Sequence, residues 1–318
     1  MSNRWARMQA FRAVSPKGDR LVYTRGSPGA NIWRIELSPT KNQNNASDVK
    51  RSPLVTSSRR TNGARTSPDG SRIVFASNRS GAGEIWLSDA SGQNVRKLTN
   101  LKAHSASPRW SSDASVVFDS TVDGHWDVYV ISTDGGRPRR LTSGLGDSSA
   151  PSWSRDGQWI YYMSAREEDV EIWKTPVSGG KPVQVTRDGG FVPLEAPDGR
   201  FVYYLKKDSH SHLFTKTEQS DGLWRARADG GEEMRIFTDP VTYRAFDVLE
   251  DGIYYLSPGR SGETLLKFYE FSNKTSALLA TIDKPVGNYL DFSPKRRWLL
   301  YTQQDEAAGD LMLVDGFR

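Results

Sequence analysis

Short runs of hydrophobic residues alternate with turn-forming residues along most of the chain. The clearest stretch, 64–99, holds apolar runs at 72–76, 84–87 and 95–98 with tight turns between them. The runs are rich in β-branched and aromatic residues, which favour strands, and the turns contain the Pro, Asp and Gly that tight turns require. The pattern predicts a four-stranded antiparallel sheet with strands connected in sequence. One such sheet cannot bury both of its faces, so we expect copies of it.

Three landmarks of this stretch recur in the same order along the chain. The first is the Asp of the opening turn, and the others are Glu84-Ile85-Trp86 and Leu98-Thr99. The turn Asp recurs at about 43-residue intervals, a period that is typical of propeller blades. It stands at positions 69, 113, 156 and 198. With weaker flanking copies there are seven units in a single domain spanning 1–318, and they start near residues 11, 64, 107, 150, 192, 245 and 289.

The succession of an SPDG turn, an apolar strand, an SNRSG turn, an EIW strand and an LT pair resembles the WD40-like PD40 repeat of the TolB family of β-propellers. The resemblance covers nearly the whole chain and implies an all-β fold. We expect a seven-bladed propeller of four-stranded antiparallel blades, with six blades as the alternative. Similar propellers occur in bacterial proteins beside winged-helix or serine/threonine kinase domains. The resemblance also favours a periplasmic location, although no signal peptide is recognisable in this sequence.

The last unit lacks an outermost strand, because the sequence ends soon after residues 310–314. We expect residues 3–9 to pair with 310–314 and to supply that strand, since an open sheet edge is usually covered. The alternative is that the outer strand precedes residue 1. We also expect Trp86, Trp153 and Trp173 to be largely buried between the blades.

Composition restricts the classes of function. The chain has no cysteine, which excludes disulfides and thiolate metal sites, and it has no apolar run long enough to span a membrane. Its net charge of +5 is a mild bias over 43 basic and 38 acidic residues. Basic clusters at 59–60 and 137–140 would have to align with stacking aromatic residues to form a nucleic-acid surface. We therefore do not expect the propeller to bind nucleic acid directly.

Compact catalytic and metal-binding motifs are absent from the sequence. It contains no GxSxG nucleophile motif, no HExxH motif and no Gly-rich phosphate loop. The repeated turn Asp is interpreted as structural, because Asp in a tight turn bonds its own backbone. His210 and His212 would face the same side of a strand, but their polar surroundings favour a solvated loop, and His104 and His125 are isolated. We expect no metal and no cofactor.

The segments that link the last strand of one unit to the first strand of the next are the candidate site. All of them must cross the disc on the same face, because every unit has the same strand order, so their residues should converge at one mouth of the channel. Loops on a rigid scaffold concentrate binding residues, and Arg, aromatic and amide groups suit a protein partner or a small polar or anionic ligand. The alternative is that these are ordinary loop residues bonded to neighbouring blades. The candidates are Arg59, Arg60, Asn62, His104, Asp147, Phe191, Tyr243, Arg244, Asn288 and Tyr289, with Arg65, Arg109 and Glu195 just inside the mouth.

The sequence thus favours a non-catalytic protein-interaction or ligand-sensing platform. By resemblance, it could be the sensor part of a larger bacterial regulator. The alternative is a propeller enzyme, a lyase or hydrolase with a polar or metal site in the central channel. That alternative requires several His, Asp or Glu side chains to converge at the channel mouth, and fold alone does not decide between the two.

Overall fold

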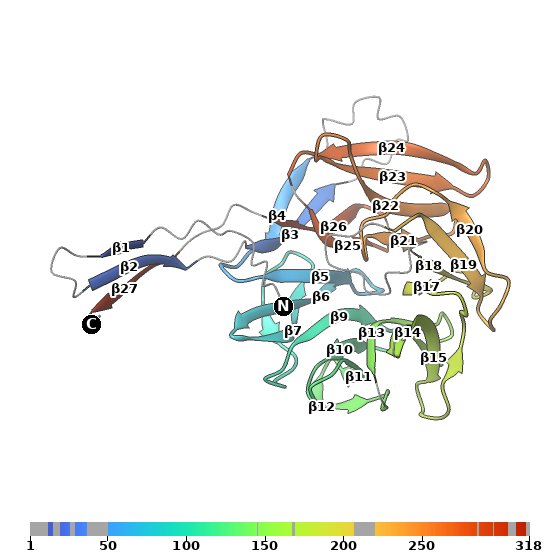
Figure 1. Cartoon of the computed structure of the whole chain (residues 1–318), viewed down its shortest axis with the longest axis horizontal. Coiled ribbons are helices and arrows are strands. Elements are labelled where there is room, and N and C mark those ends of the chain that lie inside the picture. Colours follow the sequence, from blue (N-terminus) through green and yellow to red (C-terminus); the bar gives the residue numbers. More distant parts are fainter. Residues whose placement is uncertain are drawn as a thin grey trace.

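Every described strand is paired antiparallel with a neighbour, and the strands form six four-stranded sheets that stand around a central channel as blades (Figure 1). The described residues contain no helix. The all-β class and the four-stranded blade are therefore confirmed. The structure is a computed structural model that describes residues 29–36, 50–144, 146–166, 169–206, 220–284, 286–294 and 296–304, and the backbone of strands at 12–14, 20–25 and 310–315.

Five blades consist of four consecutive strands each, running from the channel outward. Blade 1 contains β5 (Thr61–Thr66), β6 (Arg72–Ser80), β7 (Ala82–Asp89) and β8 (Arg96–Lys97), and blade 2 contains β9 (Ser105–Trp110), β10 (Ser115–Ser120), β11 (Asp127–Ser132) and β12 (Gly135–Arg140). Blade 3 contains β13 (Asp147–Trp153), β14 (Trp159–Arg166), β15 (Asp169–Pro176) and β16 (Val183–Gln184), and blade 4 contains β17 (Phe191–Glu195), β18 (Phe201–Leu205), β19 (Leu223–Arg227) and β20 (Met234–Phe237). Blade 5 contains β21 (Phe246–Val248), β22 (Gly252–Pro258), β23 (Thr264–Glu270) and β24 (Thr275–Ile282).

The sixth blade, called the closing blade below, takes strands from both ends of the chain. Its inner strands are β25 (Val286–Phe292) and β26 (Trp298–Gln304), and its outer strands are β3 (Ala30–Glu36) and β4 (Arg51–Val55). Strand β26 pairs antiparallel with β3 along its whole length. This pairing closes the ring.

The expectation of seven blades is wrong, and the alternative of six is the one observed. The landmarks of the first unit at 31–33 and 55–56 fall on β3 and beside β4, where they complete the last unit instead of forming a blade of their own. A repeat landmark indicates which strand of a blade a segment forms, but it does not indicate which other segment that strand pairs with.

The remaining strands of the first and last units form a separate three-stranded sheet beside the ring (Figure 1). Strand β2 (Arg20–Arg25) lies in the middle, between β1 (Arg12–Val14) and β27 (Asp310–Asp315). The segment 3–9, which was expected to pair with 310–314, lies outside the described residues. The closing blade receives its outer strands from β3 and β4 instead.

The EIW and LT landmarks recur because they clip the third strand of a blade to the segment after its fourth. In blade 1, the Thr99 hydroxyl donates to Oε2 of Glu84 over 2.5 Å and accepts from the Ile85 amide over 2.9 Å. Thr142 with Asp127 in blade 2, and Thr186 with Glu171 in blade 3, make the same two bonds. A buried carboxylate that accepts such bonds satisfies its own hydrogen-bonding needs and those of a strand end.

The turn Asp is structural, as interpreted from the sequence. Oδ1 of Asp69 accepts from the Ser67 hydroxyl over 2.5 Å and from the Ser71 amide over 3.0 Å. These bonds to Ser67 and Ser71 hold the pKa of Asp69 well below its usual value. Gly70, with a φ of 76°, takes the left-handed position of the turn.

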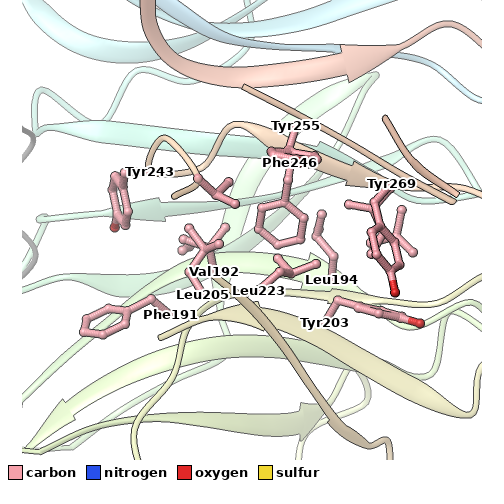
Figure 2. Packing of buried hydrophobic residues seen from close by; sticks show 14 of the residues in the cluster. Phe191, Val192, Leu194, Tyr203, Leu205, Leu223, Tyr243, Phe246, Tyr255 and Tyr269 are labelled. Atoms are coloured by element: carbon pink, nitrogen blue, oxygen red, sulfur yellow. The ribbon is translucent and has the colours of Figure 1, made fainter. Parts of the chain in front are cut away.

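Hydrophobic side chains fill the spaces between adjacent blades. Figure 2 shows the cluster between blades 4 and 5, in which Phe191 and Tyr243 lie at one end and Tyr203 and Tyr269 at the other. Because each sheet is covered on both faces, both members of the Tyr161-Tyr162 pair are buried.

The tryptophans expected to be largely buried are only half-buried. The indole N–H of Trp86 donates to the carbonyl of Ser77, and that of Trp153 donates to the carbonyl of Arg109, each over 3.2 Å. Trp173 lies at the edge of the cluster between blades 3 and 2. Each ring therefore packs against hydrophobic residues while part of it stays in contact with water.

Candidate functional site

A ring of six residues with left-handed backbone conformation narrows the channel, and each blade contributes one residue. Five of the innermost strands are irregular around this position, which is typical of a β-bulge. Side chains of the ring line a constriction of about 10 Å³, roughly the space for one water molecule. The ring consists of Gly63, Ser107, Ala150, Val192, Arg244 and Tyr289, with φ between 51° and 101°.

The ring separates the channel into two mouths. On one side lie the crossings between blades and the hairpins that join the second and third strands. A cavity of about 270 Å³ opens there and is called the crossing-side funnel below. On the other side lie the Asp turns, and a cavity of about 450 Å³ opens there, called the turn-side mouth.

The structure brings nine of the thirteen predicted binding residues together in the crossing-side funnel. Residues immediately before the ring position, such as Asn62 and Asn288, point into it because all blades share one strand order. Arg59 lies outside the funnel; it is exposed, and its amide donates to the hydroxyl of Ser57. The nine are Arg60, Asn62, His104, Asp147, Phe191, Tyr243, Arg244, Asn288 and Tyr289.

Arg65, Arg109 and Glu195 do not line the funnel. They lie two or three residues beyond the ring position of their strands, and each residue of a strand advances the chain by about 3.3 Å. This carries the side chains of Arg65 and Arg109 to the constriction and the turn-side mouth, and that of Glu195 to the turn-side mouth. Arg65 and Arg109 thus lie below the funnel, at the constriction that forms its floor, whereas Glu195 does not line the constriction.

The funnel has two different walls. Trp126, Met163, Phe191 and Tyr243 form an apolar and aromatic wall on the side of blades 2 to 5. Arg60 and amide side chains form a polar wall on the side of blade 1 and the closing blade, and one of these amides, Asn78, has a buried Oδ1 without a hydrogen-bond partner among the described residues. Such an arrangement matches a ligand with one apolar and one polar face.

Sequence reasoning missed the residues that the hairpins contribute to the funnel. Asn78, Trp126 and Met163 come from the ends of second strands or the starts of third strands. An antiparallel blade places this hairpin on the same face of the disc as the crossing. The strand order that predicted the position of the crossings therefore also predicts the position of these hairpins. The ring of His104 packs edge-on against that of Trp126, with centroids 5.3 Å apart.

The floor of the funnel carries a buried charged pair. Nη1 of Arg244 donates to the hydroxyls of Ser107 over 2.5 Å and Tyr289 over 2.6 Å, and Nη2 lies 3.7 Å from Oδ2 of Asp119. Asp119 is 1% exposed, and its Oδ2 also accepts from the Ala150 amide. Oδ1 of Asp119 and Nε of Arg244 have no partner in the described part of the chain. The floor can therefore accept and donate further hydrogen bonds.

The hydroxyl of Tyr243 borders this floor. Burial raises the pKa of Tyr243, although the positive charge of Arg244 opposes the shift, so the phenol is neutral and can donate. It points to the sulfur of Met163 at 3.8 Å, a weak acceptor. A polar ligand atom could replace that contact with a stronger one.

No group of three or more His, Asp or Glu side chains that could hold a metal ion is found within the described ranges. His210 and His212 lie outside those ranges. The same ranges contain no helix that could cross a lipid bilayer.

Comparisons with known proteins agree with the fold. Residues 49–235 match the model of the PD40 family, the TolB β-propeller domain. No curated protein sequence matches the chain significantly. A protein from Agrobacterium tumefaciens assigned as a TolB is similar in structure, with a TM-score of 0.63 and 17% identity over 87% of this chain and 98% of that one.

Two other solved structures show the range of proteins that share this fold. TolB from Acinetobacter baumannii has a TM-score of 0.57 and 14% identity, and the match covers 92% of this chain and 65% of that one. An oligogalacturonate lyase from Vibrio parahaemolyticus has a TM-score of 0.52 and 11% identity, over 91% and 76% of the two chains. At these identities the structures show a common fold and no more. The family match, which spans more than half of the sequence, shows that this chain belongs to the PD40 family of TolB β-propeller domains.

Proposed function

We propose that this propeller is a non-catalytic platform that binds a segment of a protein partner, or a small polar ligand, in the crossing-side funnel. One observation carries the proposal: an aromatic wall faces an amide-rich wall over a floor whose buried polar atoms lack partners. Buried polar groups without partners cost free energy, so a ligand that supplies those partners gains affinity.

The chemistry of the two walls supports a peptide-like occupant. Aromatic residues and Arg dominate the binding energy of protein interfaces, and Trp126, Phe191 and Arg60 place both types around one cavity. Asn62, Asn78 and Asn288 can each donate to and accept from a peptide backbone. Asn62, Asn78 and Asn288 all lie on β-strands, so this wall is formed before the partner arrives and little ordering is required on binding.

A random-peptide display library tests the proposal. Peptides selected on the wild-type protein should bind at least about tenfold more weakly to a double variant with Arg60→Ala and Asn288→Ala, because both side chains line the funnel outside the hydrophobic core. The matched control is Arg260→Ala with Gln158→Ala, which removes the same chemistry from exposed positions outside both cavities.

Three outcomes oppose the proposal. If no peptide is enriched, or if the selected peptides bind equally to both double variants, the funnel is not the binding site. If mass spectrometry instead recovers the bound peptides in cleaved form, the rival function is favoured, namely a propeller hydrolase with a polar site in the channel.

A further inference from the structure

The turn-side mouth holds two arginine side chains whose hydrogen-bonding groups are incompletely used. We propose that this mouth binds an oxyanion, a carboxylate or phosphate group, between Arg65 and Arg109. The two arginines line the constriction and the turn-side mouth but not the funnel, and the site does not rest on the function proposed for the funnel.

The two arginines occupy equivalent positions on neighbouring innermost strands. Each stands two residues beyond the left-handed residue of its blade, Arg65 on β5 and Arg109 on β9. The next blade fixes each of them in the same way: Trp110 donates its indole N–H to the carbonyl of Arg65 over 2.8 Å, and Trp153 donates to that of Arg109 over 3.2 Å. The backbone of both arginines is therefore anchored at equivalent positions, and both side chains line the constriction and the turn-side mouth.

The guanidinium of Arg109 has no hydrogen bond or ion pair with any described residue. It is enclosed by the charges of Arg65, Asp247 and Asp291, yet neither carboxylate lies within ion-pair distance. Arg65 is 4% exposed, and its Nη1 donates to the carbonyls of Ala64 and Leu290, but its Nε is buried without a partner. Arg is the side chain whose planar fork of donors best matches carboxylate and phosphate oxygens.

The carboxylates of the mouth already have donors. Oδ2 of Asp291 accepts from the amide and the hydroxyl of Thr66, each over 2.8 Å. Glu195 accepts from the Tyr161 hydroxyl over 2.7 Å and from the Arg155 amide over 2.5 Å. Oδ1 of Asp247 accepts from the amide that follows it. These bonds orient the three carboxylates toward groups other than the guanidinium of Arg109, and an oxyanion would supply Arg109 with acceptors and a negative charge.

The protonation equilibrium of Arg109 is consistent with a missing counter-ion. Burial, and then the like charge of Arg65, lower the pKa of Arg109 to about 9. Asp247 and Asp291 oppose this shift, but they do not cancel it. An oxyanion bound between the two guanidinium groups would raise the pKa of Arg109 again.

Two probes test the site: inorganic phosphate and citrate, each compared with chloride at equal ionic strength. We expect at least one of them to raise the melting temperature of the wild-type protein in a concentration-dependent way, because a ligand that binds only the folded state stabilises it. The affinity from calorimetry should fall at least about tenfold in Arg109→Gln, since bonds to charged groups dominate such sites. Arg260→Ala, which removes an exposed arginine outside both cavities, should bind as the wild type does.

A second measurement separates a binding arginine from a structural one. Arg109 has no hydrogen-bonded or ion-paired protein group to lose, and burial and the charge of Arg65 outweigh the attraction of Asp247 and Asp291, so Arg109→Gln without ligand should melt at or above the wild-type temperature. A clearly lower melting temperature, or failure to fold, would assign Arg109 a structural role and overturn the proposal. So would equal shifts in wild type and Arg109→Gln, or no shift with either probe. A response to phosphate alone would identify the oxyanion as a phosphate, and a response to citrate alone would identify it as a carboxylate.

Discussion

Blade 1 and the closing blade have the same four strands in the same order but differ in how the chain supplies them. Blade 1 is continuous, and its Ile85 on the third strand pairs with Ala76 in the hairpin just before it. In the closing blade the equivalent Ile32 pairs with Thr302, at the other end of the chain. Both isoleucines have 0% exposure. The two isoleucines are therefore equally buried, but their strand pairings close loops of very different length.

This difference shows what a repeat pattern contains. A landmark such as NIW at 31–33 states that the segment is a third strand, and the structure places it as one. The landmark does not state whose third strand it is. In a continuous blade a short hairpin fixes the pairing partner of the third strand. In the closing blade the partner is the second strand that is left unpaired when the ring closes.

The largest expected effect comes from Ile32→Ala compared with Ile85→Ala. Each should lower the free energy of unfolding by about 2 to 5 kcal/mol, because each deletes a fully buried side chain and leaves a cavity. The kinetics should differ. The long loop of the closing blade makes its pairing late in folding, so Ile32→Ala should mainly accelerate unfolding, while Ile85→Ala should also slow folding.

Stopped-flow denaturant jumps on the two variants measure this partition. Val183→Ala, at a position that is 40% exposed on the outer strand of blade 3, is the control and should change both rates little. If both isoleucine variants changed the folding rate equally, the closing blade would form together with the continuous ones. The distance along the chain between paired strands would then not decide when a blade forms during folding.

An engineered disulfide should sharpen the same comparison with a slightly smaller effect. Ala30 and Gln304 are directly opposite on β3 and β26, and antiparallel partners have Cα separations that a disulfide can span. The chain has no other cysteine, so Ala30→Cys with Gln304→Cys can form only this bond within one molecule. We expect oxidation to raise stability by about 2 to 4 kcal/mol, and reduction to reverse the gain.

The matched control for the disulfide is Ala30→Cys with Gln303→Cys. Gln303 is opposite Asn31, so its side chain points to the other face of the sheet and should not form the bond. Equal cross-linking in both pairs, or none in the first, would contradict the pairing that closes the ring.

Much of the fold could be predicted from the sequence because its landmarks have local causes. Asp69 bonds its own turn, and Thr99 bonds Glu84 within one blade, so each recurs wherever a blade is built. The count of blades could not be predicted in this way, because it depends on the pairing of β3 with β26. Strand order likewise predicted that Arg60 and Asn288 meet at one mouth.

The position of each channel residue along the channel axis could not be predicted from the sequence. That Arg109 also lines the turn-side mouth was not predicted, because the bulge at Ser107, which narrows the channel, has no clear residue signature: the ring position holds Gly in one blade and Arg in another. Trp126 was missed because only crossings were considered, although the hairpins lie on the same face. Both points concern where a side chain lies along the channel axis, which repeat spacing does not encode.

The smallest expected effect concerns charge at equivalent positions of the two kinds of blade. Where blade 1 presents Arg65, the closing blade presents Asp291, and burial, helped by the charge of Asp247 and opposed by Arg65, raises the pKa of Asp291 to about 6. A carboxyl with a raised pKa in the folded state binds its proton more tightly there than in the unfolded chain. Its contribution to stability is therefore present at low pH and is lost as the pH rises through about 6.

Asp291→Asn removes this titration and keeps an oxygen to accept from Thr66. The stability of the variant minus that of the wild type should therefore rise between pH 5 and pH 8, by roughly 1 to 3 kcal/mol. Denaturant titrations at both pH values measure the difference. In the control Asp69→Asn the difference should be flat over this range, because the pKa of Asp69 is lowered and its carboxyl is ionised in both states. If the difference is also flat for Asp291→Asn, the charge of Asp291 is fully compensated by Arg65 and Arg109. The charged residue at this channel position would then make stability no more dependent on pH in the closing blade than in blade 1.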